Sequence, residues 1–377
     1  MTKSEQLCNE IGQKCFSDDF VYENLQYIND VKNKCELCDA LFEYADIYLV
    51  VQIKERGSSA GKNEQDWLNE VVFGKAVEQI SATIHAINSF EIQVNNKHHQ
   101  PVKLHKNNVI VPLIVFDNDL IKQYKKVVKI NNYKVNVLSL SDYKEMMNAI
   151  VLPYDIFRYL QERAKWFESN ASFPDIALSE NENSTIISRI RNEKDFANFY
   201  EMNFHDGNSE KYKDALRLLT IIKNFKSKLI KTADYRQILL ILQLIKPDNA
   251  SDFMERYNYA WSKACDNRFD YSKAIQLIYN GKKTSIIFFA VGLTPFSNPR
   301  FYEVLCDAKQ QQQCSDNILL ISFIGETNGS CQIDWIYYSK EFVSNPDALK
   351  FYEEIGTFNG AIDRELYEDL CHKLLGE

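Results

Sequence analysis

One stretch constrains the fold of this chain more than any other: residues 36–54, with the sequence ELCDALFEYADIYLVVQIK. Two runs of mostly apolar, aromatic and β-branched residues, 36–44 and 47–55, flank the dipeptide Ala45-Asp46. This pattern predicts two strands that fold back on each other through a two-residue turn. Ala-Asp is not a favoured turn of that length, so a register shifted by two residues stays open. A shift of one residue would turn every side chain to the opposite face.

Three polar residues share one face of this predicted hairpin. With Ala45-Asp46 as the turn, Asp39 is directly opposite Gln52, and directly opposed side chains lie roughly 5 Å apart at Cβ. Lys54 shares their face because side chains alternate along a strand. A carboxylate, an amide and an ammonium group therefore meet on otherwise apolar strands. An ordinary solvated strand face is the alternative interpretation.

These three groups suit phosphodiester hydrolysis, which needs an activated water and a means of stabilising the charge that grows on the phosphate. A divalent ion such as Mg²⁺ provides both, and it prefers oxygen ligands, often one or two carboxylates with waters. Asp39 supplies a carboxylate and Gln52 a neutral oxygen. Lys54 is suited to position the attacking water or to stabilise the developing charge.

The same residues carry a resemblance to a known family. Asp39, followed about a dozen residues later by Gln52-Ile53-Lys54, resembles the signature of the PD-(D/E)xK nuclease superfamily in the QxK variant of Mrr-like restriction enzymes. The resemblance covers roughly residues 18–165. It implies an α/β fold, with a restriction-endonuclease-like mixed sheet flanked by helices, and a Mg²⁺- or Mn²⁺-dependent endonuclease that hydrolyses DNA. It also implies that Asp39 and Gln52 bind the metal and that both act in catalysis with Lys54.

A further carboxylate is expected, because Gln52 in place of the commoner acid leaves the site one negative charge short. The resemblance places an acid on the first helix of the fold, and we assign this catalytic and metal-binding role to Glu23, in a helix expected over residues 18–30. Neighbouring alternatives are Glu36, Glu43 and Glu55. The resemblance also implies a strand before the one that carries Asp39. Residues 30–36 leave no room for a full strand, so we expect a permuted or trimmed order.

The chain around the hairpin predicts the rest of an α/β domain. Residues 56–65 are polar and rich in Gly and Ser, and we expect a mobile loop beside the site. A long helix is expected from about residue 63 to 87, with an apolar stripe along one side. By resemblance, Lys75 and Gln79 on this helix bind the substrate; solvation at the surface is the alternative for both. Other strands are expected at 91–94, 109–116 and 133–140, and other helices at 4–16, 141–150 and 153–168.

The length of 377 residues predicts two domains. We place a nuclease-like domain over residues 1–170 and a helix-rich α/β domain over residues 171–377, with the polar segment 169–185 as a linker or a loop at the domain edge. The second domain carries no motif that assigns a function. We expect it to act as a sensor or to bind a protein partner, and a homo-oligomer is a further expectation.

Composition limits the classes of function. A hydrophobic content of 45% with 25% charged residues is typical of a soluble globular protein, and no apolar run is long enough to span a membrane. The first residues lack the apolar core of a signal peptide, and nine scattered cysteines favour reduced thiols, so we expect a cytoplasmic protein. The net charge of −8 argues against a nonspecific DNA binder. Lysine-rich stripes at 122–129 and 223–236 are either local DNA contacts or solvated helix faces.

Two other groups of residues have metal-binding side chains. Cys35 and Cys38 resemble half of a zinc or redox site, but Cys8 and Cys15 have the wrong spacing for the other half, so buried thiols are expected. The second group consists of His98, His99 and His105, in a polar segment where we expect solvent exposure.

Two hypotheses from different classes follow. The first is a metal-dependent DNA endonuclease with a role in bacterial defence against foreign DNA, the latter by family analogy alone. The second is a non-catalytic scaffold that binds nucleic acid or protein and keeps the nuclease fold. Convergence of Asp39, Gln52 and Lys54 with an acid on one open cleft would favour the first.

Overall fold

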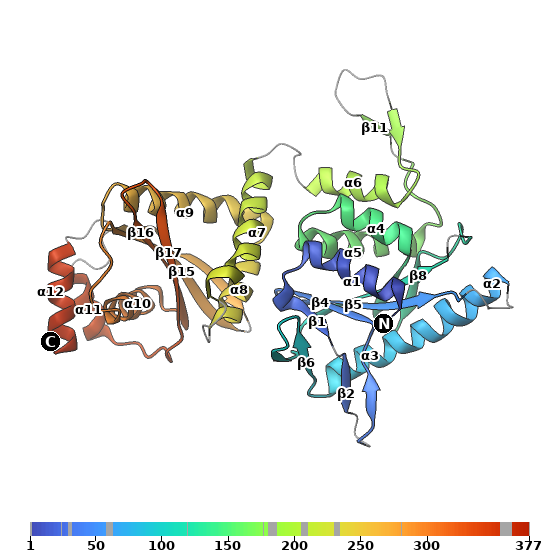
Figure 1. Cartoon of the computed structure of the whole chain (residues 1–377), viewed down its shortest axis with the longest axis horizontal. Coiled ribbons are helices and arrows are strands. Elements are labelled where there is room, and N and C mark those ends of the chain that lie inside the picture. The colour runs from blue at the N-terminus through green and yellow to red at the C-terminus, as the bar shows by residue number, and fades with distance from the viewer. Residues whose placement is uncertain are drawn as a thin grey trace. The chain divides into compact units, whose positions relative to one another are not determined.

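The computed structural model of this chain shows an α/β protein (Figure 1). It describes residues 2–23, 25–28, 32–57, 63–118, 120–175, 177–179, 187–204, 210–229, 234–279, 281–354 and 364–376. The chain divides into two compact units, Met1–Ser209 and Glu210–Glu377. Within the described residues, no helix has the length and apolar character needed to cross a membrane.

A mixed sheet of eight strands, in the order β7-β6-β1-β4-β5-β8-β10-β9, forms the centre of the first unit. The strands are β1 (Val21–Glu23), β4 (Ala40–Tyr44), β5 (Ile47–Glu55), β6 (Gln93–Asn96), β7 (Pro101–Lys103), β8 (Val109–Asp117), β9 (Val127–Ile130) and β10 (Tyr133–Ser139). Strands β5, β8 and β10 are parallel neighbours, and every other pairing in this sheet is antiparallel. The expected mixed sheet is therefore present.

The predicted hairpin is confirmed with its register. Tyr44 pairs with Ile47, and Phe42 pairs with Leu49. Ala45 adopts the positive φ, 54°, that the favoured two-residue hairpin turns require at this position, although such a conformation costs energy for a residue with a Cβ. The register shifted by two residues is thereby excluded.

The long helix after the hairpin covers one face of the sheet. It comprises α2 (Glu64–Trp67), a π-helical stretch η2 (Leu68–Ala76) and α3 (Val77–Ser89). Its buried residues, among them Ile80 and Ile84, form one apolar cluster with Tyr48 and Val50 of β5. The expected helix and its apolar stripe are confirmed; the π-helical stretch was not expected from the sequence.

Helix α1 (Lys3–Cys15) packs against α4 (Leu140–Ala149), β4 and β5, and α5 (Pro153–Ser169) packs against β8, β9 and β10. The Phe42 ring stacks on Phe16 at 5.1 Å between centroids and meets Phe157 edge-on at 5.9 Å. Leu41, the residue before it, belongs to the cluster beneath α3, so Phe42 faces the opposite side of the sheet. Gly12 lets α1 approach closely, because a Cβ there would overlap the Phe42 ring.

The helix expected over residues 18–30 is wrong. That segment forms a 3₁₀ turn, η1 (Asp18–Phe20), then β1 and β2 (Gln26–Ile28). Strand β2 pairs with β3 (Lys34–Glu36) in a separate two-stranded ribbon. Strand β1 pairs antiparallel with β4, Tyr22 opposite Leu41. Strand β1 is therefore the strand before β4 for which residues 30–36 left no room. Pairing with strands distant in the chain outweighs the local preference of this segment for a helix.

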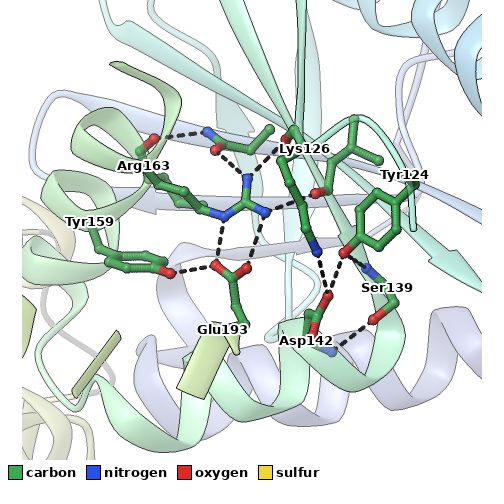
Figure 2. Close-up of polar contacts among 10 residues, drawn as sticks. Tyr124, Lys126, Ser139, Asp142, Tyr159, Arg163 and Glu193 are labelled. Atoms are coloured by element: carbon green, nitrogen blue, oxygen red, sulfur yellow. Dashed lines mark hydrogen bonds and ion pairs between the residues drawn. The ribbon is translucent and has the colours of Figure 1, made fainter. Parts of the chain in front are cut away.

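The boundary between the units lies after α6 (Glu193–Phe204), and not near residue 170 as the sequence suggested. Figure 2 shows why: Arg163 of α5 is fully buried and forms a two-pronged pair with Glu193, Nε to Oε1 at 2.6 Å and one terminal nitrogen to Oε2 at 3.1 Å. Tyr159 donates a hydrogen bond to the same carboxylate. Carbonyl oxygens of Lys126, Asn136 and Val137 accept the remaining guanidinium bonds. A short hairpin, β11 (Ala177–Ser179) and β12 (Ile187–Arg189), precedes α6.

The second unit is a helix-rich α/β unit with its own sheet, and no sheet formed by the described residues spans both units. Strands β15 (Lys282–Gly292) and β16 (Asn317–Gly325) are parallel and joined through α10 (Arg300–Gln313). The other strands are β13 (Asp270–Tyr271), β14 (Ile275–Tyr279) and β17 (Cys331–Tyr338). The other helices are α7 (Glu210–Leu229), α8 (Tyr235–Gln243), η3 (Pro247–Asn249), α9 (Ala250–Cys265), α11 (Pro346–Glu354) and α12 (Arg364–Leu375). Helix α9 packs on both central strands.

Candidate active site

The candidate site lies at the open end of the β4–β5 hairpin. Asp39 directly precedes β4, and its N–H donates to the Val51 carbonyl at 3.2 Å. The carboxylate accepts a hydrogen bond from the side-chain amide of Gln52 and another, at 2.5 Å, from the N–H of Ile53. Strand β4 begins only at Ala40, so its pairing with β5 ends before Ile53. The Asp39 carboxylate accepts the hydrogen bond of the Ile53 N–H instead.

Lys54 completes the group that the hairpin register predicted. Its Nζ lies 3.7 Å from Asp39 Oδ2 and donates to the Ile53 carbonyl at 3.0 Å. The Lys54 side chain is 16% exposed and that of Asp39 8%, while Gln52 is buried. The three side chains therefore converge, with the ammonium group nearest the surface.

The charge of Asp39 is incompletely compensated. Burial is the largest influence and raises the pKa of this carboxyl group, and the negative charges of Glu36 and Glu5 raise it further. The Ile53 N–H and the Lys54 ammonium group lower the pKa by less, so it stays above its ordinary value. A buried carboxylate with a raised pKa in a cleft is typical of a functional site, and a bound cation would stabilise its ionised form.

Asp39 lines an open cleft of about 810 Å³. Helix α1 forms one wall with Glu5 and Glu10, and Glu36 and Lys97 contribute from other segments. Four carboxylates and one described ammonium group thus line the cleft, which makes it acidic. An acidic cleft requires cations before it accepts a polyanion such as DNA.

Glu23, assigned from the sequence to a helix, lies instead on strand β1, and its side chain is outside the described residues. The first helix of the structure is α1, and the acid that it brings near Asp39 is Glu5. Glu5 also accepts a hydrogen bond from the Thr2 N–H at 2.8 Å in a capping box. Sequence reasoning missed Glu5, although the spacing of Thr2 and Glu5 marks a helix start.

The other acidic alternatives have different surroundings. Glu43 is buried, accepts a hydrogen bond from Tyr22 and lies 3.4 Å from the Asn108 side-chain amide. Glu55 and Asp117, at the ends of β5 and β8, share the hydroxyl of Ser4 at 2.9 and 2.6 Å. Both line a second hollow of about 430 Å³. Glu36 is the alternative that lines the cleft with Asp39.

The proposed substrate contacts Lys75 and Gln79 are exposed on the long helix, and neither is among the described residues that line the cleft. Half of the expected mobile loop, residues 58–62, lies outside the described residues. Of the first lysine-rich stripe, Lys126 is partly buried and pairs with Asp142 at 3.3 Å (Figure 2). Part of the second stripe lies outside the described residues.

The donor set near Asp39 was tested for a divalent cation. Among the described residues, no three His, Cys, Asp or Glu side chains form a group that would hold a metal by themselves. A hard cation, however, accepts amide oxygens and waters as well as carboxylates. The Gln52 amide contacts Asp39 through its nitrogen, and a half-turn of that amide presents the oxygen instead. Asp39 and Gln52 are therefore the residues whose oxygen atoms would contact a divalent cation here, and Glu5 is a further carboxylate of the same cleft.

The cysteines and histidines singled out in the sequence do not form a metal-binding group within the part of the chain that the structure describes. The thiols of Cys35 and Cys38 donate to different carbonyls, those of Asn33 at 3.8 Å and Ala40 at 3.4 Å. The Nε2 atom of His98 lies 3.8 Å from Oδ2 of the buried Asp19, so the imidazole and this carboxylate form a local pair. Of the thiols expected to be buried, those of Cys8, Cys15 and Cys38 are buried and that of Cys35 is half-buried.

No family model matches the sequence, and no curated protein or solved structure matches the chain. The case for a function therefore depends on the residues and geometry of the site.

Proposed function

We propose that the first unit is a metal-dependent endonuclease of the PD-(D/E)xK type that hydrolyses phosphodiester bonds of DNA. The observation that carries this proposal is the convergence of Asp39, Gln52 and Lys54 at the end of one hairpin. Ordinary solvated strand faces seldom bury a carboxylate to 8% exposure beside an acidic cleft.

The order of elements supports the proposal as well. Helix α1 precedes an antiparallel trio, β1, β4 and β5, and the long helix leads to β8, which pairs parallel with β5. This is the helix, hairpin, helix and strand order that the resemblance implies, together with the strand before β4. The β2–β3 ribbon is an addition to it.

Asp39, Gln52 and Glu5 would hold the divalent ion. When bound, that ion lowers the pKa of a water molecule and stabilises negative charge on the phosphate. The chain's own residues do the rest. The Ile53 N–H holds the Asp39 carboxylate in place, and Lys54 orients the attacking water or donates to the phosphate oxygen on which charge develops.

Cleavage of supercoiled plasmid and linear duplex DNA with Mg²⁺ or Mn²⁺ tests the proposal. Asp39→Ala and Lys54→Ala should each lower the cleavage rate by a factor on the order of 10²–10³, as expected for loss of one strong electrostatic contact. Lys103→Ala is the matched control, since Lys103 is an exposed lysine paired with Glu91. Unchanged folding of each variant is checked by circular dichroism.

Two outcomes would overturn the proposal. Equal cleavage by the wild type and Lys54→Ala would remove Lys54 from the reaction. No metal-dependent cleavage by the wild type, with retained DNA or protein binding, would favour the non-catalytic scaffold. A role in bacterial defence depends on family analogy alone, and phage plating on cells that carry the wild type or Lys54→Ala tests it.

A further inference from the structure

Two cysteines of the second unit, far apart in the sequence, lie side by side. Cys265 ends helix α9 and Cys331 begins strand β17. Their sulfur atoms are 3.4 Å apart across a separation of 66 residues. All nine cysteines are free thiols, and this pair has a sulfur–sulfur contact.

Tight backbone packing holds the two residues in this position. Gly325, at the end of β16, lies so close to the carbonyl of Ala264 that a Cβ on Gly325 would overlap it. The turn that follows is closed by a hydrogen bond from the Glu326 N–H to the Ser330 carbonyl at 2.8 Å. Gly329 within it has φ of 81°, which glycine adopts at little cost. The β16–β17 turn and the end of α9 are therefore in direct contact.

The two thiols have different surroundings. Cys265 Sγ donates to the Gly329 carbonyl at 3.4 Å on the exposed side of the turn. Cys331 Sγ points toward the helix and donates to the Trp261 carbonyl at 3.6 Å. Burial, and next the contact with Cys265, raises the pKa of Cys331 to about 12. Both thiols are half-buried, and the Cys265 sulfur, whose hydrogen bond lies on the exposed side of the turn, is the one that we expect to meet a reagent from solution first.

We propose that Cys265 and Cys331 form a reversible disulfide, an oxidative modification site that reacts with peroxides. Disulfide sulfurs lie about 2.0 Å apart, so the two sulfur atoms, now at 3.4 Å, must approach by about 1.4 Å. This site is independent of the proposed nuclease activity.

The reaction balances with hydrogen peroxide as the oxidant. The Cys265 thiolate attacks one peroxide oxygen, the O–O bond breaks, and Cys265 becomes a sulfenic acid while hydroxide leaves and takes up a proton to form water. The Cys331 sulfur then attacks the Cys265 sulfur, the S–O bond breaks, and the Cys331 proton leaves with the departing oxygen as a second water. The two sulfurs lose two electrons and the peroxide gains them. A dithiol reductant reverses the bond by exchange.

The bond would link the end of α9 to the start of β17 and so enclose the central strands of the unit in a covalent loop. Such a loop lowers the entropy of the unfolded chain. Oxidation should therefore raise the thermal transition of the second unit on the order of 5 °C or more, and dithiothreitol should return it to its starting value.

Peptide mapping of the peroxide-treated full chain tests the proposal. Trypsin cuts after Lys263 and Arg268 and so isolates Cys265, but it leaves Cys314 and Cys331 in one peptide. A second cut by a glutamate-specific protease after Glu326 separates those two. The expected product is the Cys265 peptide joined to the Cys331 peptide, with a faster band on a non-reducing gel.

Cys314→Ser is the matched control, because Cys314 is exposed and contacts only the Gln311 carbonyl among its described hydrogen bonds. Cys314→Ser should keep the linked peptide and the thermal shift, and Cys265→Ser should lose both. Cys265→Ala provides a second variant if the serine disturbs folding. The proposal is overturned if peroxide gives no Cys265–Cys331 peptide, or if Cys314→Ser abolishes the shift.

Discussion

The Lys54 ammonium group lies 3.7 Å from the Asp39 carboxylate, and Asp39 directly precedes β4 while Lys54 lies on β5 of the same hairpin. The carboxylate is also bound by the Ile53 N–H next to Lys54 in the chain. A displacement of either strand by one residue would therefore break the ion pair and the backbone bond together. The hairpin register and the chemistry of the site depend on the same contacts.

Gln52→Glu should keep DNA cleavage and lower the Mg²⁺ concentration needed for half-maximal rate, because an anionic oxygen replaces a neutral one. Without metal, the variant loses the hydrogen bond to Asp39 and brings two carboxylates together. Its free energy of unfolding in EDTA should therefore fall by about 1–3 kcal/mol. Thermal unfolding across a Mg²⁺ titration measures both effects. Gln93→Glu, at an exposed position, is the control, and equal metal responses of the two variants would contradict the assignment of Gln52.

Glu5→Gln separates the charge of this residue from its structural role. Glutamine keeps the capping hydrogen bond to Thr2, since Glu and Gln serve equally at that position. The loss of charge beside Asp39 should lower metal affinity by about 10–100-fold, as measured by the Mg²⁺ dependence of cleavage.

Glu10→Gln is the control on the same helix and in the same cleft, where Glu10 accepts a hydrogen bond from Gln6 at 2.8 Å. Its Mg²⁺ dependence should match the wild type. If Glu10→Gln weakens metal binding as much as Glu5→Gln, the effect comes from the total negative charge of the cleft, and Glu5 is not a metal ligand.

The hairpin was predictable because the residues that determine it are neighbours in the sequence. Its strands, its two-residue turn and the alternation of its side chains lie within 36–55, and the structure confirms the register. The error at residues 18–30 has the opposite cause. Strands β1 and β2 have three residues each, which is too short for a recognisable alternation of apolar and polar side chains. Strand β1 is held by pairing with β4 and β6, and β2 by pairing with β3.

Contacts between distant residues explain the other differences. Arg163 and Glu193 are 30 residues apart, and each alone reads as a charged residue on a helix surface. Their pairing moves α6 into the first unit. Likewise, nothing near Cys265 in the sequence points to Cys331. The sequence assigned the further acid to Glu23 on a helix over residues 18–30, but Glu23 lies on strand β1.

The pKa of Asp39 makes stability depend on pH in a defined direction. Burial raises this pKa, so the folded state keeps a proton at pH values where the unfolded chain, with an ordinary pKa near about 4, has released it. The contribution of Asp39 to the free energy of unfolding therefore falls as pH rises through that window. Asp39→Asn removes this titration.

Relative to the wild type, Asp39→Asn should gain stability as the pH rises from about 4 until Asp39 is fully ionised, and then stay level. The raised pKa of Asp39 already includes the attraction of the Lys54 ammonium group. This ion pair therefore does not reverse the direction of the expected change in stability. Urea unfolding at a series of pH values measures the difference. Asp252→Asn, which removes a half-exposed carboxylate paired with Arg256, is the control. A relative loss of stability by Asp39→Asn with rising pH would show that its charge is well compensated.

The buried pair of Arg163 and Glu193 predicts where the first unit can be cut. A fragment of residues 1–209 keeps α6 and should fold, whereas a fragment of residues 1–170 loses Glu193 and should be markedly less stable or unfolded. In the full chain, Glu193→Ala leaves the Arg163 guanidinium buried without its counter-ion. The cost should be about 3–5 kcal/mol, measured by urea unfolding.

Glu168→Ala is the control, because Glu168 pairs with Lys134 while its side chain is 37% exposed. Surface pairs contribute about 1 kcal/mol or less, so this variant should stay close to the wild type. A double variant, Arg163→Met with Glu193→Leu, should recover much of the loss, because apolar side chains of similar size often replace a buried ion pair without cost. If the fragment of residues 1–170 proves as stable as that of residues 1–209, α6 does not belong to the first unit.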